Sequence, residues 1–383
     1  MNNRNNKVSV ILIHYNQKKF INGALSSIFK QNYKNLELII ADDASKDFNL
    51  DAVKKFVNKQ NRNKFKVKYL INKENIGTVK NLNRALKQVT GDYVLIFAAD
   101  DELYDEKVIS KMVEFYNKQD DDVSIVFGQC LMMDEKLLNI KEKFIDVKKA
   151  KEFNEMSSFE QYKVLSTNCF AAMGACMLSV KMLKEENCFD DRLMYIEDWT
   201  YFLKTTLSNH RMKYINYNCL LHRDGGISHT TNVTKAKIDF VKDLLRLSEL
   251  YVFLNFKKFS EKDKNYIVKR YIENREYVIA NGYEYDDSNY SKLKKDNLIF
   301  FAKRKLNQIS SEFGPRLKKQ LKIEIILLFL TTIFLTLYRI FVTGLSTIFK
   351  NLTLFFLILS IVEFIRILML IFIKIIYKIK DIK

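Results

Sequence analysis

Residues Val94 to Leu103 read VLIFAADDEL, and this stretch decides the fold. Its apolar beginning is typical of a strand that is buried in a sheet, yet the run ends on two neighbouring carboxylates, Asp100 and Asp101. An unpaired carboxylate is costly to bury, so such a pair either faces solvent at the strand end or is held by a cation. The surrounding sequence distinguishes between these two interpretations.

Strands and helices are predicted to alternate up to this stretch. Short β-branched runs predict strands, and apolar residues at a helical spacing predict helices. Such alternation predicts an α/β fold with a mostly parallel, doubly wound sheet and helices on both faces. In such sheets ligands bind where the carboxyl ends of the strands open into loops. The predicted strands cover residues 7–13, 36–41, 67–71 and 93–98, and the predicted helices cover residues 16–31, 50–58 and 78–89.

Acidic pairs occur at two of these carboxyl ends. Asp42 and Asp43 follow one strand, as Asp100 and Asp101 follow another. A single pair is explained equally well by a helix N-cap that faces water. Four carboxylates around one crevice would repel one another unless they hold a divalent metal or meet donors on a polar ligand, and an oxygen-rich site suits Mg²⁺ or Mn²⁺. Such metals are commonly bound together with phosphate oxygens, so the sequence indicates a nucleoside diphosphate as the ligand.

Composition narrows the class of protein. The chain has 383 residues, 48% of them hydrophobic, which is enough for one large or two ordinary domains with a real core. The net charge of +18 is spread along the chain and mixed with acids, which fits a basic surface, an anionic membrane or a nucleic acid. Five cysteines without a CxxC pair favour a reducing compartment.

Two apolar runs towards the C-terminal end predict membrane association. Residues 323–342 and 352–377 are each long enough to span a bilayer as a helix, and basic residues on both flanks favour a hairpin with both ends in the cytosol. The alternative is a pair of amphipathic helices that lie on the membrane surface or on a partner. The N-terminal segment is polar, so we expect no signal peptide and place the protein at the cytoplasmic face of the plasma membrane.

Three blocks of sequence carry a resemblance to a known family. They read VSVILIHYNQKKFINGALSSIFKQNYKNLELIIADDAS, ENIGTVKNLNRAL and GDYVLIFAADDEL. These blocks resemble the opening blocks of the inverting family 2 glycosyltransferases, which include cellulose, chitin and hyaluronan synthases and many bacterial capsule and lipopolysaccharide enzymes. The resemblance covers residues 7–228. It implies a GT-A fold, in which a nucleotide-binding α/β sheet is fused to an acceptor-binding half.

The resemblance implies a role in donor binding for residues of all three blocks. Asp100 and Asp101 stand at the family's metal-binding aspartate motif, where they would hold Mn²⁺ or Mg²⁺ on the diphosphate. Ala98 occupies the place of the first aspartate in the fuller motif, so fewer carboxylates would hold the metal. The residues implied near the donor nucleotide are Tyr15, Asp43, Asn75, Gly77 and Lys80.

The catalytic base is expected in the second half. The segment DRLMYIEDWTYF resembles the Glu-Asp motif that opens the family's base-carrying helix, which makes Asp198 the candidate base and Glu197 its neighbour. From the residues alone, a helix start that the macrodipole favours is the commoner explanation of this acidic pair. Trp199, the only tryptophan, is expected either to stack on an acceptor sugar or to belong to the core. The segment FAAMGACMLS, around Gly174, resembles the family's glycine-containing strand beneath the donor sugar.

A histidine and an arginine compete for one further role. His222 lies in LLHRDGGISH, near the place where related enzymes put a histidine or arginine on the diphosphate or metal. Arg223 is the alternative phosphate ligand, and a lone histidine is also often structural.

We therefore expect three parts. Residues 1–230 form the catalytic domain, residues 231–320 a helical subdomain, and residues 321–383 the membrane-associated tail. The expected function is metal-dependent, inverting transfer of a sugar from a nucleoside-diphosphate sugar to a hydroxyl of a glycan or lipid-linked acceptor in bacterial surface polysaccharide biosynthesis. The alternative is a non-catalytic membrane scaffold or nucleic-acid-binding protein that keeps the fold. Clustered, costly carboxylates argue against that alternative, so we expect no nucleic-acid partner.

Overall fold

The computed structural model describes residues 6–46, 48–224, 232–286, 288–297, 300–302 and 323. The chain divides into two compact units, Met1–Tyr290 and Ser291–Lys383. Apart from residue 323, the predicted apolar tail segments 323–342 and 352–377 lie outside the described residues. Within the described part of the chain, no helix is both long and apolar enough to cross a membrane. The account below concerns the first unit.

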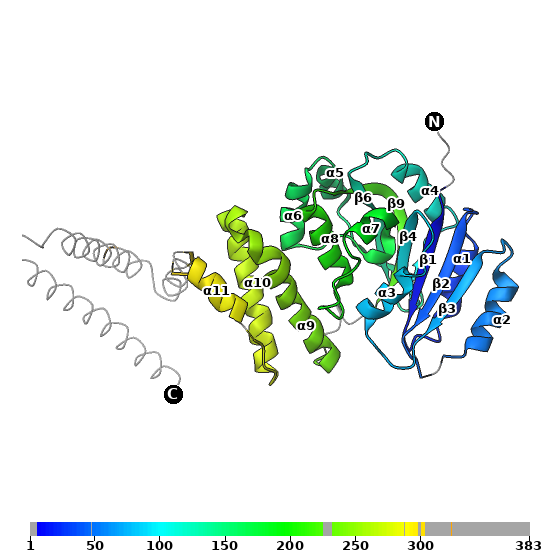
Figure 1. Ribbon diagram of the computed structural model, residues 1–383, viewed down its shortest axis with the longest axis horizontal. Coiled ribbons are helices and arrows are strands. Elements are labelled where there is room, and N and C mark those ends of the chain that lie inside the picture. The colour runs from blue at the N-terminus through cyan, green and yellow to red at the C-terminus, as the bar shows by residue number, and fades with distance from the viewer. Residues whose placement is uncertain are drawn as a thin grey trace, which may run out of the picture. The chain divides into compact units, whose positions relative to one another are not determined.

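The first half of this unit contains the predicted alternation of strands and helices. Four neighbouring strands pair in parallel in the order β3-β2-β1-β4. Figure 1 shows α1 and α2 on one side of these strands and α3 on the other. The predicted strands and helices are confirmed to within a few residues. Their bounds are β1 Val8–His14, α1 Ile21–Phe29, β2 Leu36–Asp42, α2 Leu50–Gln60, β3 Lys66–Ile71, α3 Thr78–Leu86 and β4 Tyr93–Ala98.

The second half extends this sheet in mixed directions. The full strand order is β3-β2-β1-β4-β8-β6-β9-β5, with β7 paired to β6. Strand β8 runs antiparallel to both β4 and β6, whereas β9 runs parallel to β6. The doubly wound parallel sheet that the sequence predicts is therefore correct for β1 to β4 but not throughout, because β8 enters between two strands of the opposite direction. The new strands are β5 Glu102–Leu103, β6 Val123–Met133, β7 Ile140–Lys143, β8 Cys176–Ser179 and β9 Arg211–Arg223.

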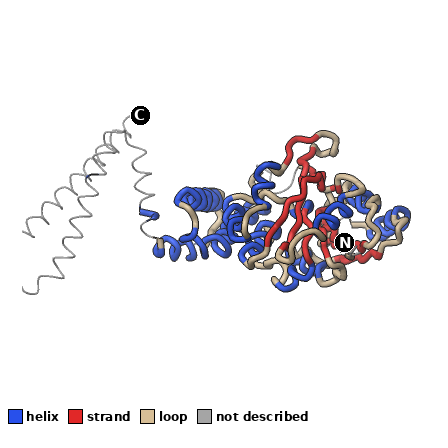
Figure 2. The backbone as a smooth tube through the Cα atoms, turned by 90° about the horizontal axis from the view of Figure 1, so that it is seen from above, coloured by secondary structure: helices blue, strands red, loops and turns tan. Residues whose placement is uncertain are grey.

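Helices cover the sheet in the second half as well, as Figure 2 shows. Side-chain caps fix several of their starts; at α6, for example, Ser157 and Glu160 form a reciprocal capping box. The helices are α4 Val108–Tyr116, α5 Val147–Asn154, α6 Ser158–Thr167, α7 Val180–Glu185, α8 Glu197–Leu207, α9 Lys235–Leu247, α10 Glu261–Ala280 and α11 Ser288–Asp296. Short helical turns cover Met173–Ala175, Ser248–Val252 and Phe253–Lys258.

Alternate residues of the central strands build the main core. Val8, Val10 and Leu12 of β1 are fully buried and belong to one cluster with residues of α1, α2 and α4. A smaller, separate cluster holds α9 against α10, through residues such as Ile238 and Tyr271. The helices predicted after residue 231 are thus present as α9 and α10, and they belong to the same compact unit as the sheet.

Candidate active site

The pairing of β5 with the end of β9 assembles one end of the site. In this antiparallel pair Glu102 lies opposite Leu221. Asp101 directly precedes Glu102, and His222 directly follows Leu221. The strand register therefore brings Asp101 and His222 face to face, although they lie far apart along the chain.

Asp101 is the centre of this end. Its carboxylate is 4% exposed and accepts hydrogen bonds from Nδ1 of His222 at 3.0 Å and from the backbone N–H of Arg223 at 3.1 Å. Burial alone would lower the pKa of His222, but the hydrogen bond and the charge of Asp101 outweigh burial and raise it. The pair is thus a buried carboxyl group hydrogen-bonded to an imidazole ring.

The pKa of Asp100 is also raised, but for a carboxyl group this shift disfavours the charged form. Burial and, next, the charge of the neighbouring Asp101 raise the pKa of Asp100 to about 6, while a hydrogen bond from Gln17 works against both. Two carboxylates and an imidazole at the end of a parallel strand are a donor set that suits a divalent cation, whose charge would relieve this repulsion. The described residues hold no preformed group of three such ligands.

Arg223 turns away from His222. Its Nε donates to the carbonyl oxygen of Asp100 at 2.9 Å, and its guanidinium carbon lies 4.3 Å from the centre of the Phe20 ring. A weak ion pair of 3.7 Å joins it to Glu102. His222 and Arg223 are the two residues considered for the predicted phosphate contact. His222 lines the central cavity, whereas Arg223 lines a separate pocket beside Asp100.

A cavity of about 660 Å³ connects this end to the predicted catalytic pair. Its lining includes Asp101 and His222 from one part of the chain and Glu197 and Asp198 from another. Asp101 of the predicted metal site and the predicted base thus open into the same space, whereas Asp100 lines a separate pocket together with Arg223. Tyr15, Gln17, Met173, Gly174, Trp199, Phe240 and Arg270 also line it.

Glu197 and Asp198 form the first turn of α8 and are enclosed by protein at the bottom of the cavity. Burial raises the pKa of both carboxyls, and the charge of Asp198 raises that of Glu197 further. Oδ1 of Asp198 accepts the backbone N–H of Trp199 at 2.6 Å. Oε2 of Glu197 is buried and has no hydrogen-bond partner. Both carboxyls of the pair therefore hold a proton more readily than exposed carboxyls do.

Asp243 of α9 fixes the approach to this helix. Its Oδ2 accepts the backbone N–H groups of Met194 and Tyr195 at 2.6 and 2.8 Å, directly before α8 begins. The carboxylate is 1% exposed, and Arg246 provides an ion pair at 3.3 Å. No sequence pattern marked Asp243, because a buried acid on an amphipathic helix resembles a solvated one.

Trp199 and Arg270 pack together beside the catalytic pair. The indole N–H of Trp199 donates to the carbonyl of Leu165 at 2.7 Å, and the ring is mostly buried. The guanidinium carbon of Arg270, from α10, lies 4.6 Å from the centre of that ring. Trp199 lines the cavity, so its predicted stacking on an acceptor sugar stays a prediction. Arg270 was not anticipated.

The residues predicted near the nucleotide fall into two groups. Tyr15 is 44% exposed and lines the cavity. Asp43, in contrast, accepts the backbone N–H groups of Ile76 and Gly77, both at 2.9 Å, and thereby orders the loop before α3. Its role at the ribose stays a prediction.

The same loop contains the remaining predicted donor residues. Oδ1 of Asn75 accepts the N–H of Gly77 at 3.0 Å. Gly77 needs to be glycine because its φ of 88° lies in the left-handed region. Lys80 is exposed on α3 and, like Asn75 and Gly77, does not line the cavity. Their contribution to donor binding remains a prediction.

Gly174 lies in the floor of the cavity. The sequence predicts a strand over residues 170–179, but only Cys176–Ser179 is a strand, and Gly174 belongs to the helical turn before it. A Cβ at this position would lie 2.7 Å from Cδ2 of Leu220 and 3.0 Å from Cβ of Phe97. Close approach of three chain segments therefore requires glycine here.

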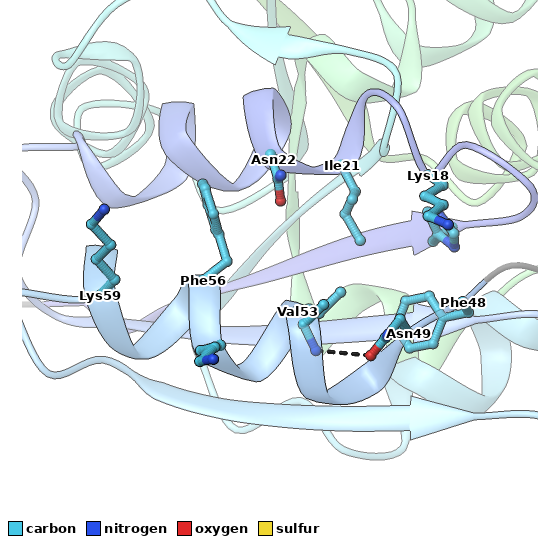
Figure 3. A pocket seen from close by; sticks show the side chains of 11 residues that line it. Lys18, Ile21, Asn22, Phe48, Asn49, Val53, Phe56 and Lys59 are labelled. Atoms are coloured by element: carbon cyan, nitrogen blue, oxygen red, sulfur yellow. Dashed lines mark hydrogen bonds between the residues drawn. The ribbon is translucent and has the colours of Figure 1, made fainter.

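A second pocket lies between α1 and α2 (Figure 3). Its volume is about 450 Å³, and its labelled lining includes the rings of Phe48 and Phe56 and the amines of Lys18 and Lys59. None of the predicted site residues lines it. The chemistry therefore concentrates in the central cavity.

An α/β sheet of this topology, with clustered carboxylates where its strands end, defines an enzyme of the glycosyltransferase class. Residues 9–186 match the family model named glycosyl transferase family 2, so this part of the chain is similar to that family.

Curated relatives and a solved structure are also similar to this chain. An uncharacterized glycosyltransferase of Haemophilus influenzae is 34% identical over 113 residues, which are 30% of this chain and 33% of the relative. The chain thus spans a third of that protein's length. The GalNAc(5)-diNAcBac-PP-undecaprenol β-1,3-glucosyltransferase of Campylobacter jejuni is 32% identical over 139 residues, 36% of this chain and 42% of the relative. The structure of S. aureus TarS residues 1–349 with UDP-GlcNAc aligns with a TM-score of 0.50 at 20% identity, covering 71% of this chain and 73% of that one, which shows the shared GT-A-like fold.

Proposed function

We propose that the protein is a metal-dependent, inverting glycosyltransferase that moves a sugar from a nucleoside-diphosphate sugar to a hydroxyl of a lipid-linked glycan acceptor. One observation carries this proposal: the cavity joins the Asp101–His222 pair to Glu197 and Asp198. The acceptor hydroxyl needs a base, which Glu197 and Asp198 would supply. The leaving diphosphate needs a positive charge, which a metal held at the Asp101–His222 pair would supply.

Asp101, Asp100 and His222 are the residues that would hold Mn²⁺ or Mg²⁺. A bound divalent ion would supply Lewis-acid neutralisation of the charge on the leaving nucleoside diphosphate. The chain itself contributes the orientation of its ligands, because β5 pairing and the backbone N–H of Arg223 fix the Asp101 carboxylate before any ligand arrives. Since three preformed ligands are absent from the described residues, diphosphate oxygens would complete the shell.

Asp198 is the proposed general base. Its Oδ1 is occupied by the N–H of Trp199, so we assign proton transfer from the acceptor hydroxyl to Oδ2. Burial raises the pKa of Asp198, which makes it a better proton acceptor than an exposed aspartate. One base and one displacement invert the anomeric centre. Among the described lining residues, the other carboxylates are Glu197, which adjoins the base, and Asp101, which belongs to the proposed metal end.

The acceptor is proposed to be lipid-linked. The name of the Campylobacter relative contains an undecaprenyl diphosphate acceptor. The apolar runs 323–342 and 352–377 would keep the cavity near a bilayer, where such a carrier lies. The proposed setting is bacterial surface polysaccharide biosynthesis at the cytoplasmic face of the plasma membrane.

The test is turnover of a panel of nucleotide sugars by the purified full-length protein, with and without Mn²⁺. We expect one donor to be hydrolysed or transferred only with metal, and Asp101→Asn to abolish this activity. Glu106→Gln is the control, because Glu106 is an exposed acid five residues further along the same loop. If the wild type turns over no donor, or if Asp101→Asn leaves turnover unchanged, the enzyme is not of this kind, and a non-catalytic scaffold becomes the better interpretation.

A further inference from the structure

We propose that Arg270 forms a phosphate-binding subsite for the acceptor at the base end of the cavity. The inference rests on the proposed glycosyl transfer and adds to it the chemical class of the acceptor, which would carry a phosphate close to the sugar that is extended. The residue comes from α10, in the helical region after the sheet, which has otherwise no assigned chemistry.

Arg270 lies at the base end rather than the metal end. Its guanidinium packs on Trp199, the residue that follows Asp198. The thiol of Cys169 lies within the influence of both groups: burial and the charge of Asp198 raise its pKa, while Arg270 lowers it. Because Trp199 directly follows Asp198, a ligand group that meets Arg270 belongs to the acceptor side.

The charge of Arg270 has no acidic partner in the described part of the chain. Burial lowers its pKa, and the groups that act against this are Tyr266 and Cys169 rather than an aspartate or glutamate. A partly buried cation without a carboxylate is costly unless a ligand supplies the anion. A guanidinium binds a phosphate through two parallel N–H···O bonds, so phosphate fits this requirement.

A structural role explains only part of this arrangement. Nη1 of Arg270 donates to the carbonyl of Thr167 at 3.2 Å, and Thr167 is the last residue of α6, where a cation is favourable. That contact and the packing on Trp199 hold the side chain in place. The side chain of Tyr266 is a further hydrogen-bond partner, and the remaining donors of the guanidinium are left for the cavity that Arg270 lines.

Trp199 provides the readout, because it is the only tryptophan of the chain and Arg270 lies against it. The full-length protein is titrated in EDTA, where the unmetallated Asp100 and Asp101 repel anions, and tryptophan fluorescence is recorded. The probes are inorganic phosphate, farnesyl diphosphate, glycerophosphoglycerol and farnesol. The second and third probes distinguish a lipid diphosphate from a phosphodiester within a glycan, and farnesol controls for the lipid alone.

We expect saturable fluorescence changes with phosphate and with one phosphate ester. Arg270→Met should weaken this binding by about tenfold or more, and Arg270→Lys, which keeps the charge without the fork, should weaken it less. Lys269→Met is the control, because Lys269 is an exposed neighbour paired with Glu273. Equal binding of phosphate to wild type and to both Arg270 variants would overturn the subsite, as would binding of farnesol alone.

Donor hydrolysis separates this inference from the proposed function. Arg270→Met should reduce transfer to a phosphate-bearing acceptor far more than it reduces donor hydrolysis with Mn²⁺, because water needs no phosphate contact. A wild type without donor hydrolysis contradicts the proposed function itself. A wild type that hydrolyses the donor but binds phosphate independently of Arg270 contradicts only the subsite.

Discussion

The carboxylate of Asp101 lies 3.0 Å from Nδ1 of His222, although 121 residues separate the two along the chain. Neither residue depends on a flexible loop for this contact, because Asp101 adjoins β5 and His222 is part of β9. The pair is therefore set by strand register, and its geometry is available before a donor binds.

His222→Gln should weaken the metal affinity of the enzyme rather than its fold. The substitution removes the imidazole that holds Asp101, and loss of such a partner typically lowers metal affinity by about 10- to 100-fold. The measurement is transfer rate against Mn²⁺ concentration, with Glu106→Gln as the control. An unchanged Mn²⁺ dependence would show that His222 is only structural.

Asp198→Asn should lower kcat by about 10²- to 10⁴-fold while donor binding stays unchanged, because a general base acts only in the transition state. In the wild type, kcat should fall as the pH drops through the pKa of Asp198, which burial holds above that of an ordinary aspartate. The pH profile of kcat and the affinity for the nucleoside diphosphate are both measured. Weakened nucleotide binding with normal kcat would assign Asp198 to the donor instead.

Asp243→Ala should affect both stability and catalysis. It leaves the N–H groups of Met194 and Tyr195 without their acceptor, which costs about 1–3 kcal/mol, and frees the start of α8. We expect a lower midpoint of urea unfolding and a kcat about tenfold lower, with an unchanged KM for the donor. Glu276→Gln, an exposed acid of α10, is the control. A loss of stability without any change in kcat would mean that α9 does not orient the base.

The pKa of Glu37 predicts how the free energy of unfolding depends on pH. Burial by itself would raise its pKa, but hydrogen bonds from Ser9, Thr90 and Lys7 outweigh burial and lower the pKa to about 2. A depressed native pKa contributes stability above the pKa of the unfolded chain, about 4.3, which is lost as the pH falls towards 2. The contribution at pH 7 is about 2–3 kcal/mol. The free energy of unfolding should therefore decrease from pH 5 to 3, as a pH series of urea denaturation can test.

Glu37→Gln supplies the matching variant. Because glutamine does not titrate, its unfolding free energy should lose most of this slope, whereas Glu276→Gln should keep it. Parallel slopes for wild type and Glu37→Gln would exclude Glu37 as the source.

The sequence predicts the first half of the fold because its strands carry their own signal. Runs such as residues 93–98 are apolar throughout, as expected for strands with both faces covered. Strand β9 was not anticipated, because it mixes polar and apolar residues along its 13 positions, as a partly covered strand does. Without β9, nothing in the sequence places His222 rather than Arg223 in the cavity.

The candidate site was predictable where a motif occupies consecutive residues. The pairs Asp100–Asp101 and Glu197–Asp198 stand out as adjacent carboxylates. Asp243 and Arg270 do not, because one charged residue on an amphipathic helix looks the same whether it faces solvent or a cavity. Only the packing of α9 and α10 reveals which direction it takes.

The pairing of β5 with β9 also bears on the order in which the molecule forms. Strands β1 to β4 are complete by residue 98, whereas the contact of Asp101 with His222 closes a loop of 121 residues. Closing such a loop costs about 4 kcal/mol of chain entropy, so it forms late, after local structure has already formed. Until the second half has left the ribosome, a nascent chain therefore lacks the contact of Asp101 with His222, and we expect it to have no metal-dependent activity.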